Sequence, residues 1–246
     1  MTTPIKHILL AASLCIVQTG YSAITFAPVT GFNPNTHFNG GITAGIDFDV
    51  DSSGDPGAQY VTQSGFLSVP ASNATTINVT TGGITFDLSV SGTNAGNQNR
   101  WRGNANAGAL INDFAQWFNN TNSQVEGHLN LSGLTPNADY EITFFIYNVG
   151  AGQNTHLFYE GTSSASPLIT SFTTSGNQNN YSTWSPGITF FANSGSLGEI
   201  DITAQSNVGS GRLTFNGISV IAAIPEPSTA FLSLLGGIAL VLRRRR

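Results

Sequence analysis

The segment GITFDLSV, residues 83–90, carries the pattern on which the fold prediction rests. In it, Thr, Asp and Ser alternate with the apolar residues Ile84, Phe86, Leu88 and Val90. Successive side chains of a β-strand point to opposite faces of the sheet. The alternation therefore predicts a strand that buries one face in a core and leaves the other face polar.

Two other segments, ITAGIDFDV at residues 42–50 and DYEITFFIY at residues 139–147, repeat this alternation. Additional strands are expected where short apolar segments lie between turns rich in Gly, Asn, Ser and Pro, namely near residues 24–30, 59–69, 75–80, 125–134, 155–161, 167–174, 187–193, 198–204 and 211–221. About a dozen short strands of this kind predict an all-β fold, an antiparallel β-sandwich of the jelly-roll type.

One segment predicts a helix instead of a strand. In ALINDFAQWF, residues 109–118, the apolar residues Leu110, Phe114 and either Trp117 or Phe118 follow i, i+4, i+7 spacing. This spacing places the three side chains on one face of a helix of about two turns. Such a short helix does not change the predicted fold class.

The last expected strand changes its alternation in the middle. Leu213 and Phe215 share one parity, whereas Ile218 and Val220 share the other. A β-bulge adds one residue to a strand and shifts the parity of everything after it. A bulge at Gly217 is therefore expected, because it would let both pairs face the core.

Residues 1–23 are typical of a secretory signal peptide. Lys6 precedes an apolar stretch, and the small residues Gly20 and Ser22 stand three and one positions before an expected cut. A buried N-terminal helix is the alternative interpretation. Cys15 is the only cysteine and lies inside this stretch, so export would leave a mature chain without a thiol. Disulfides and cysteine nucleophiles are then excluded.

Residues 24–222 are expected to form one β-sandwich domain, with a division near residues 92–108 as the alternative. The domain contains every acidic residue of the chain except Glu226, but only three arginines. Phosphate backbones are bound by clustered Lys and Arg. The acidic balance therefore argues against nucleic acid as a partner.

Residues 223–246 form a tail of unusual composition. It begins with the triplet Pro225, Glu226 and Pro227, continues with an apolar run over residues 230–242, and ends in Arg243, Arg244, Arg245 and Arg246. As a helix the run would be about 20 Å long, short of the roughly 30 Å core of a bilayer. The arginines favour a cytoplasmic stop after this short hydrophobic helix. The two prolines predict an extended, accessible segment before it.

This order of triplet, apolar run and arginine cluster resembles the PEP-CTERM sorting signal of exported bacterial proteins. The resemblance implies that the export machinery delivers the chain, that the tail holds it transiently in the inner membrane, and that an exosortase recognises and cuts near the triplet. It also implies a cell-surface or extracellular-matrix destination linked to exopolysaccharide and biofilm. A short tail anchor that is never cut is the alternative.

Residues 107–221 bear a second resemblance, to galactose-binding-like jelly rolls. It is carried by the segments ALINDF, VEGHLNLSGLTPNADYEITFF, GSLGEIDIT and RLTFNGISVI. The resemblance implies carbohydrate binding, an inference by analogy because one fold hosts many functions. Aromatic rings stack on sugars while Asn and Arg donate hydrogen bonds. The candidate glycan-binding residues are those that combine these types in polar loops, namely Arg100, Trp101, Arg102, Tyr181 and Trp184. Alternatively, these rings close the ends of the sandwich.

The segment DFDVDSSGDPG, residues 47–57, suggests a metal site. Asp49, Asp51 and Asp55 offer carboxylate oxygens, which suit Ca²⁺, and the segment matches the first six positions of a calcium loop. The twelfth position is Tyr60, where such a loop has a bidentate Glu. The alternative, which we favour, is a solvated polar face of a half-buried strand. Calcium is the one cofactor that the sequence suggests.

Catalytic motifs are weakly represented. His128 alternates with Glu126 on the outward side of its expected strand and belongs to no hydrolase or metalloprotease motif. Four acidic residues could supply a carboxylate pair for glycoside hydrolysis, namely Glu126, Asp139, Glu141 and Glu160. Their spacing in the sequence does not select one pair. We therefore expect a non-enzymatic structural or carbohydrate-binding protein, with a polysaccharide hydrolase or lyase as the alternative.

Overall fold

The fold is known from a computed structural model that describes residues 24–29, 38, 41–48, 64–70, 74–93, 97–101, 113–121, 123–146, 154–173, 187–207 and 211–223. The expected signal peptide and the expected tail helix lie outside these residues. No helix occurs in the described part of the chain. Within these residues, accordingly, there is no helix long and apolar enough to cross a membrane.

The regular secondary structure of the described residues consists of strands, most of them four to eight residues long. In chain order they are β1 (Thr25–Pro28), β2 (Ala44–Asp47), β3 (Leu67–Ser68), β4 (Thr76–Thr81), β5 (Ile84–Ser91), β6 (Asn97–Trp101), β7 (Asp113–Phe118), β8 (Glu126–Ser132), β9 (Asp139–Phe145), β10 (Thr155–Glu160), β11 (Leu168–Thr173), β12 (Gly187–Asn193), β13 (Ile200–Ser206), β14 (Arg212–Phe215) and β15 (Gly217–Ala222). The predicted all-β class is confirmed.

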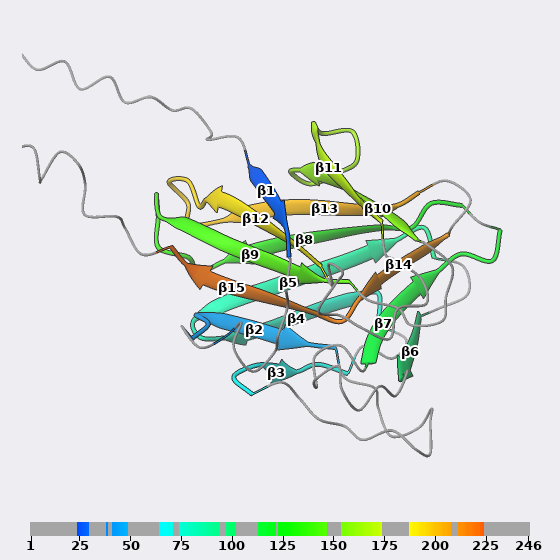
Figure 1. Ribbon diagram of the computed structural model, residues 1–246, viewed down its shortest axis with the longest axis horizontal. Helices are drawn as coiled ribbons and strands as arrows, with labels where there is room; N and C mark the ends of the chain where they lie inside the picture. Colours follow the sequence, from blue (N-terminus) through cyan, green and yellow to red (C-terminus); the bar gives the residue numbers. More distant parts are fainter. Residues whose placement is uncertain are drawn as a thin grey trace, which may run out of the picture.

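The strands form two six-stranded sheets and a smaller third sheet (Figure 1). Sheet A has the order β1-β12-β9-β15-β2-β3, sheet B the order β11-β10-β13-β8-β5-β4, and sheet C the order β14-β7-β6. All pairings are antiparallel except that of β2 with β3. Sheets A and B pack as the two layers of the predicted antiparallel β-sandwich.

The core lies between these layers and is rich in aromatic rings. Phe144 of β9 contacts three rings in edge or tilted geometry, with centroids 5.5 to 5.7 Å apart, namely those of Phe158, Phe190 and Phe215. These four rings come from sheets A, B and C and are at most 1% exposed. Burial of each such ring stabilises the fold by roughly 1.5–3 kcal/mol.

The alternation in β5 agrees with the prediction from residues 83–90. Its four apolar residues are buried, whereas Thr85 and Asp87 are half-buried and Ser89 and Ser91 are exposed. In β8, likewise, apolar or glycine positions are buried and the intervening polar positions are half-buried. Sheet B thus has one apolar face toward sheet A and one polar outer face.

The predicted helix at 109–118 is wrong, because residues 113–118 form β7. This strand is hydrogen-bonded on both edges, to β6 and to β14. Ala115 and Trp117, two positions apart, are both 0% exposed, as expected for one face of a strand. The backbone pairing on both sides and the burial of the indole outweigh a weak local preference for a helix.

The predicted bulge at Gly217 is replaced by a change of sheet. Leu213 and Phe215 belong to β14 in sheet C, and Gly217 begins β15 in sheet A. Asn216 lies between them, where its N–H donates to the Phe145 carbonyl at 2.8 Å and its carbonyl accepts from the Phe48 N–H at 2.8 Å. The parity shift therefore marks the point at which the chain passes from one sheet to the other.

The strand directions give the sandwich two distinct ends. Thr25, Phe191, Glu141 and Ile221 form one row across sheet A. Three strand spacings, about 14 Å, thus separate the start of β1 from the end of β15. We call this the tail end, because β15 ends there, and it lies toward the left of Figure 1. The opposite end, where β9 ends and β12 begins, is called the loop end.

Candidate functional site

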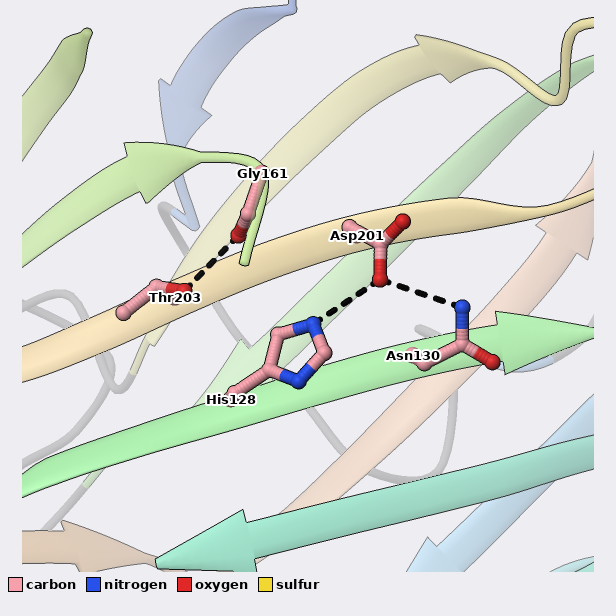
Figure 2. Close-up of polar contacts among 5 residues, drawn as sticks. All are labelled: His128, Asn130, Gly161, Asp201 and Thr203. Carbon is pink, nitrogen blue, oxygen red and sulfur yellow. Dashed lines mark hydrogen bonds and ion pairs between the residues drawn. The ribbon is translucent and has the colours of Figure 1, made fainter. Parts of the chain in front are cut away.

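The polar outer face of sheet B is the best-described candidate site. His128 and Asn130 of β8 point outward beside Asp201 of β13 (Figure 2). The register pairs Asp201 directly with Asn130, and β5 contributes Ser89 opposite His128 and Asp87 opposite Asn130. This arrangement follows from the two-residue period of adjacent strands, which aligns polar side chains on one face.

One carboxylate oxygen organises this network. Asp201 Oδ1 accepts hydrogen bonds from His128 Nε2, at 2.8 Å, and from Asn130 Nδ2, at 3.1 Å. Because a carboxylate only accepts, His128 Nε2 carries a proton. The side chains of His128 and Asp201 are 25% and 31% exposed, so the pair is reached by solvent. These partly exposed side chains can therefore exchange hydrogen bonds with hydroxyl groups of a ligand.

The turn between β10 and β11, residues 161–167, is hydrogen-bonded to side chains of β13 and β8 on this face. Thr203 Oγ1 donates to the Gly161 carbonyl at 2.7 Å (Figure 2). Thr203 is 0% exposed. The Ser164 N–H donates to Glu126 Oε2 at 3.3 Å, and Gln205 Nε2 donates to the same oxygen at 3.1 Å. Glu126 Oε2 therefore links the turn, through Ser164, to β13, through Gln205.

The four carboxylates considered for glycoside hydrolysis are distributed over both layers of the sandwich. Glu126 lies on the outer face of sheet B, whereas Asp139 and Glu141 belong to β9 of sheet A. Asp139 accepts a hydrogen bond from Asn193 Nδ2 at 2.7 Å. Glu160 ends β10, and its N–H donates to the Pro167 carbonyl. Glu126 and Glu141 therefore cannot act on one sugar bond.

The candidate glycan-binding residues lie at the margins of the described structure. Arg100 and Trp101 end β6, where they pair with Phe114 and Asp113. Arg102, Tyr181 and Trp184 lie outside the described residues. Trp117, the remaining tryptophan, is a core residue whose Nε1 donates to the Ala74 carbonyl at 2.8 Å.

The calcium candidates Asp49, Asp51 and Asp55 also lie outside the described residues. The alternative of a solvated polar face is wrong for Asp47, which is 0% exposed. Phe66 lies over the outer face of sheet A at Gly45, where an added Cβ would come within 2.7 Å of the ring. Among the described residues, no group of three His, Cys, Asp or Glu side chains could hold a metal ion.

The outer face of sheet A is covered at Phe145 as well. The Phe38 ring lies 5.8 Å from the Phe145 ring and 5.1 Å from the Phe66 ring, and Phe145 is 0% exposed. Phe145 has the opposite parity to the core residues Phe144 and Ile146, so it faces away from the core, and the Phe38 ring packs on it there. This face is therefore closed to a ligand at its loop-end half.

His156 is a buried polar residue that sequence patterns did not identify. It is 0% exposed, and its Nε2 accepts a hydrogen bond from the Thr214 N–H at 3.1 Å. The bond joins β10 of sheet B to β14 of sheet C. Burial lowers the pKa of His156 from 6.5 to about 4. The only signal in the sequence was its position, two residues before Phe158 and on the same face of the strand.

Comparisons with known proteins do not place the chain in a family. No model of a protein family and no curated protein matches it. Among solved structures it is similar to a family 35 carbohydrate-binding module from Clostridium thermocellum, at 16% identity and a TM-score of 0.31, over 61% of this chain and 100% of that one. It is also similar to the carbohydrate-binding module TmCBM61 in complex with β-1,4-galactotriose, at 14% identity and a TM-score of 0.34, over 55% and 88%.

A third similar structure is the enzymatically active domain of bacteriophage CBA120 tailspike protein 4, at 10% identity and a TM-score of 0.36 over 56% of this chain. The match spans 19% of that chain. At TM-scores this low, the similarity does not establish the fold. The fold is established by the strands of this chain and their pairing. The activities in the names of the similar proteins belong to those proteins.

Proposed function

We propose that this chain is an exported, non-enzymatic β-sandwich protein of the cell surface or extracellular matrix, and that it contacts exopolysaccharide. Its tail holds it in the inner membrane until an exosortase cuts near Pro225, Glu226 and Pro227. The polysaccharide contact involves the loop end and the polar outer face of sheet B. The outer face of sheet B suits a hydroxyl-rich ligand, since it offers donors and acceptors of hydrogen bonds.

The observation that carries the sorting proposal is the place where the last described strand ends. The Ala223 N–H, directly after β15, donates to the Asp139 carbonyl at 2.9 Å. Ala223 is the last described residue of the chain. Pro225 follows two residues later. A cut at the triplet would therefore remove none of the strands in the described part of the chain.

The placement of the candidate glycan-binding residues supports contact away from the membrane. Thr173 ends β11 and Gly187 begins β12, both at the loop end, and these two residues flank the segment that contains Tyr181 and Trp184. The tail leaves from the opposite end. A chain held by its tail would thus direct the loop end toward the extracellular polymer.

Substitution of Glu226 tests the sorting proposal. Glu226→Ala, or deletion of residues 243–246, is expected to leave export intact but to keep the protein in the membrane fraction at a higher mass. The matched control is Glu199→Ala, which removes an exposed acid at the tail end of the domain and is expected to be processed normally. Fractionation of producing cells and immunoblotting measure both. Normal mass and location of both tail variants would refute the proposal.

Removal of the loop aromatics tests the glycan proposal. In a pull-down with exopolysaccharide from the producing cells, Trp184→Ala and Tyr181→Ala are each expected to weaken binding about five- to tenfold, since ring stacking contributes roughly 1 kcal/mol. Leu168→Ala, an exposed apolar residue of β11, is the control and should bind normally. A wild-type protein that binds no polysaccharide would leave a purely structural role.

A further inference from the structure

A buried carboxamide and a buried hydroxyl meet in sheet C. Gln116 of β7 and Thr214 of β14 are register partners and are 3% and 0% exposed. Gln116 Nε2 donates to Thr214 Oγ1 at 3.3 Å. Since the C–N bond of an amide is about 1.33 Å long, Gln116 Cδ lies at most about 4.6 Å from this oxygen. Because Oγ1 accepts the bond, one of its lone pairs faces the carboxamide.

The backbone brings these two side chains close together. The Thr214 N–H donates to His156 Nε2 at 3.1 Å, so it points away from β7, the neighbour of β14 in sheet C. Thr214 and Gln116 therefore form a non-hydrogen-bonded pair of the antiparallel ladder. Opposite side chains approach most closely in such pairs, whose Cα atoms are about 4.5 Å apart. The contact between hydroxyl and carboxamide is thus set by the strand pairing.

His156 places an uncharged base beside Thr214. The ring is 0% exposed, and burial lowers the pKa of His156 to about 4, so the imidazole is neutral near pH 7. Its Nδ1 has no hydrogen-bond partner among the described residues. A buried polar atom without a partner costs stability, and a chemical role is one reason to retain it. A neutral imidazole can accept a proton and release it again.

We propose that Thr214 and Gln116 condense to an ester that joins β14 to β7 covalently. Thr214 Oγ1 forms a bond to Gln116 Cδ, and the bond between Cδ and Nε2 breaks. The hydroxyl proton, relayed by His156, leaves with the nitrogen as ammonia, so the step needs no water, oxidant or cofactor. Burial of the pair protects the ester, because it excludes the water that would hydrolyse it.

The ester supplies a covalent link that this chain cannot obtain from a disulfide. The sequence contains one cysteine, so no disulfide can join two of its own segments. Thr214 lies 98 positions after Gln116, and a link that closes a loop of this length restricts the unfolded chain. The ester therefore stabilises sheet C, the smallest of the three sheets.

Peptide mapping of the purified full chain tests the ester. Digestion with pepsin in acid, which preserves esters, is expected to yield a linked pair of peptides that contains residues 116 and 214. The pair should be lighter than its two peptides together by about 17 Da, the mass of one ammonia. Mild base should then separate the peptides and leave a glutamate at position 116. This measurement does not depend on where either end of the chain is cut.

Thr214→Val removes the hydroxyl but keeps the shape of the side chain, so it is expected to give unlinked peptides with an intact Gln116. It should also unfold at a temperature about 10 °C lower than wild type, because the closed loop is lost. Thr143→Val is the matched control. It removes a buried hydroxyl from the Thr143–Thr189 pair of sheet A and should keep the linked peptides.

His156→Gln keeps an acceptor for the Thr214 N–H but cannot relay a proton, so this variant should fold with the pair largely unlinked. Loss of the ester lowers stability equally at every pH, which separates it from any effect of the imidazole on the pH dependence of stability. Complete linkage in His156→Gln would overturn the role of His156.

Separate, unmodified peptides from the wild-type chain would overturn the ester itself. A loss of about 17 Da that persists in Thr214→Val would overturn it as well, because the ammonia would then come from another place, such as a succinimide at an Asn-Gly pair.

Discussion

Replacement of His156 by glutamine is expected to make the domain markedly more resistant to acid. The wild-type protein should lose about 3 kcal/mol of unfolding free energy between pH 6.5 and pH 4 through this one residue. Glutamine places an uncharged acceptor near the position of Nε2 and does not titrate. The variant should therefore have a flatter dependence of stability on pH over this range.

The direction follows from the state in which His156 is buried. Its Nε2 accepts a hydrogen bond from the Thr214 N–H, so the ring is neutral in the folded protein, and burial lowers the pKa of His156 to about 4. The unfolded chain takes up a proton near pH 6.5. Below that pH the unfolded state binds more protons than the folded state. The stability is thus complete above pH 6.5 and is lost as the pH falls toward 4.

Urea unfolding at a series of pH values measures this effect. His128→Gln is the matched control, because it removes a histidine that is 25% exposed on the outer face of the same sandwich. The control should keep the steep loss of stability between pH 6.5 and 4. Equal slopes for wild type and His156→Gln would contradict a buried neutral His156.

Replacement of Trp117 by alanine is expected to lower the unfolding free energy by about 3–5 kcal/mol. The indole is 0% exposed and packs 5.9 Å from the Phe48 ring and 6.1 Å from the Phe215 ring. Its Nε1 also donates to the Ala74 carbonyl. One side chain of sheet C therefore contacts sheet A and the segment before β4, so its removal opens a cavity where three parts of the fold meet.

Trp117→Phe separates packing from hydrogen bonding. It keeps a ring but removes the donor to Ala74, so we expect a smaller loss of about 1–2 kcal/mol. Thermal unfolding followed by near-UV circular dichroism compares the two variants. A loss below about 1 kcal/mol for Trp117→Ala would place the indole outside the core, as an exposed face of a short helix would require.

The sequence predicted the strands whose burial is one-sided. Alternation in residues 83–90 identified β5, because this strand packs one face on the core and the period-two pattern is then visible. It failed at β7, where Gln116 is buried along with Ala115 and Trp117. A strand buried on both faces loses its polar alternation, and a chance i, i+4 spacing then resembles a helix.

Contacts between distant segments explain the other differences. Asp47 lies in an alternating strand, but Phe66, nineteen residues later in the chain, lies over the neighbouring Gly45. Likewise, the bond from Thr214 to His156 joins strands that the sequence separates by 58 residues. Single-sequence patterns report local periodicity and contain no information on such partners.

The candidate site was predicted in part. Outward placement of His128 and Glu126 followed from alternation, and the structure confirms it. Their partners, Asp201 and the 161–167 turn, could not be predicted, because strand order sets which polar rows become neighbours. The loop aromatics and the sorting triplet stay predictions that rest on the sequence.

The mass of the released protein tests the central claim most directly. Intact-mass spectrometry of the form shed by producing cells is predicted to show a chain that begins near Ala23 and ends near the triplet at residues 225–227. The form that remains in the inner membrane should keep the arginines at 243–246. A released protein that still carries those arginines would contradict the account.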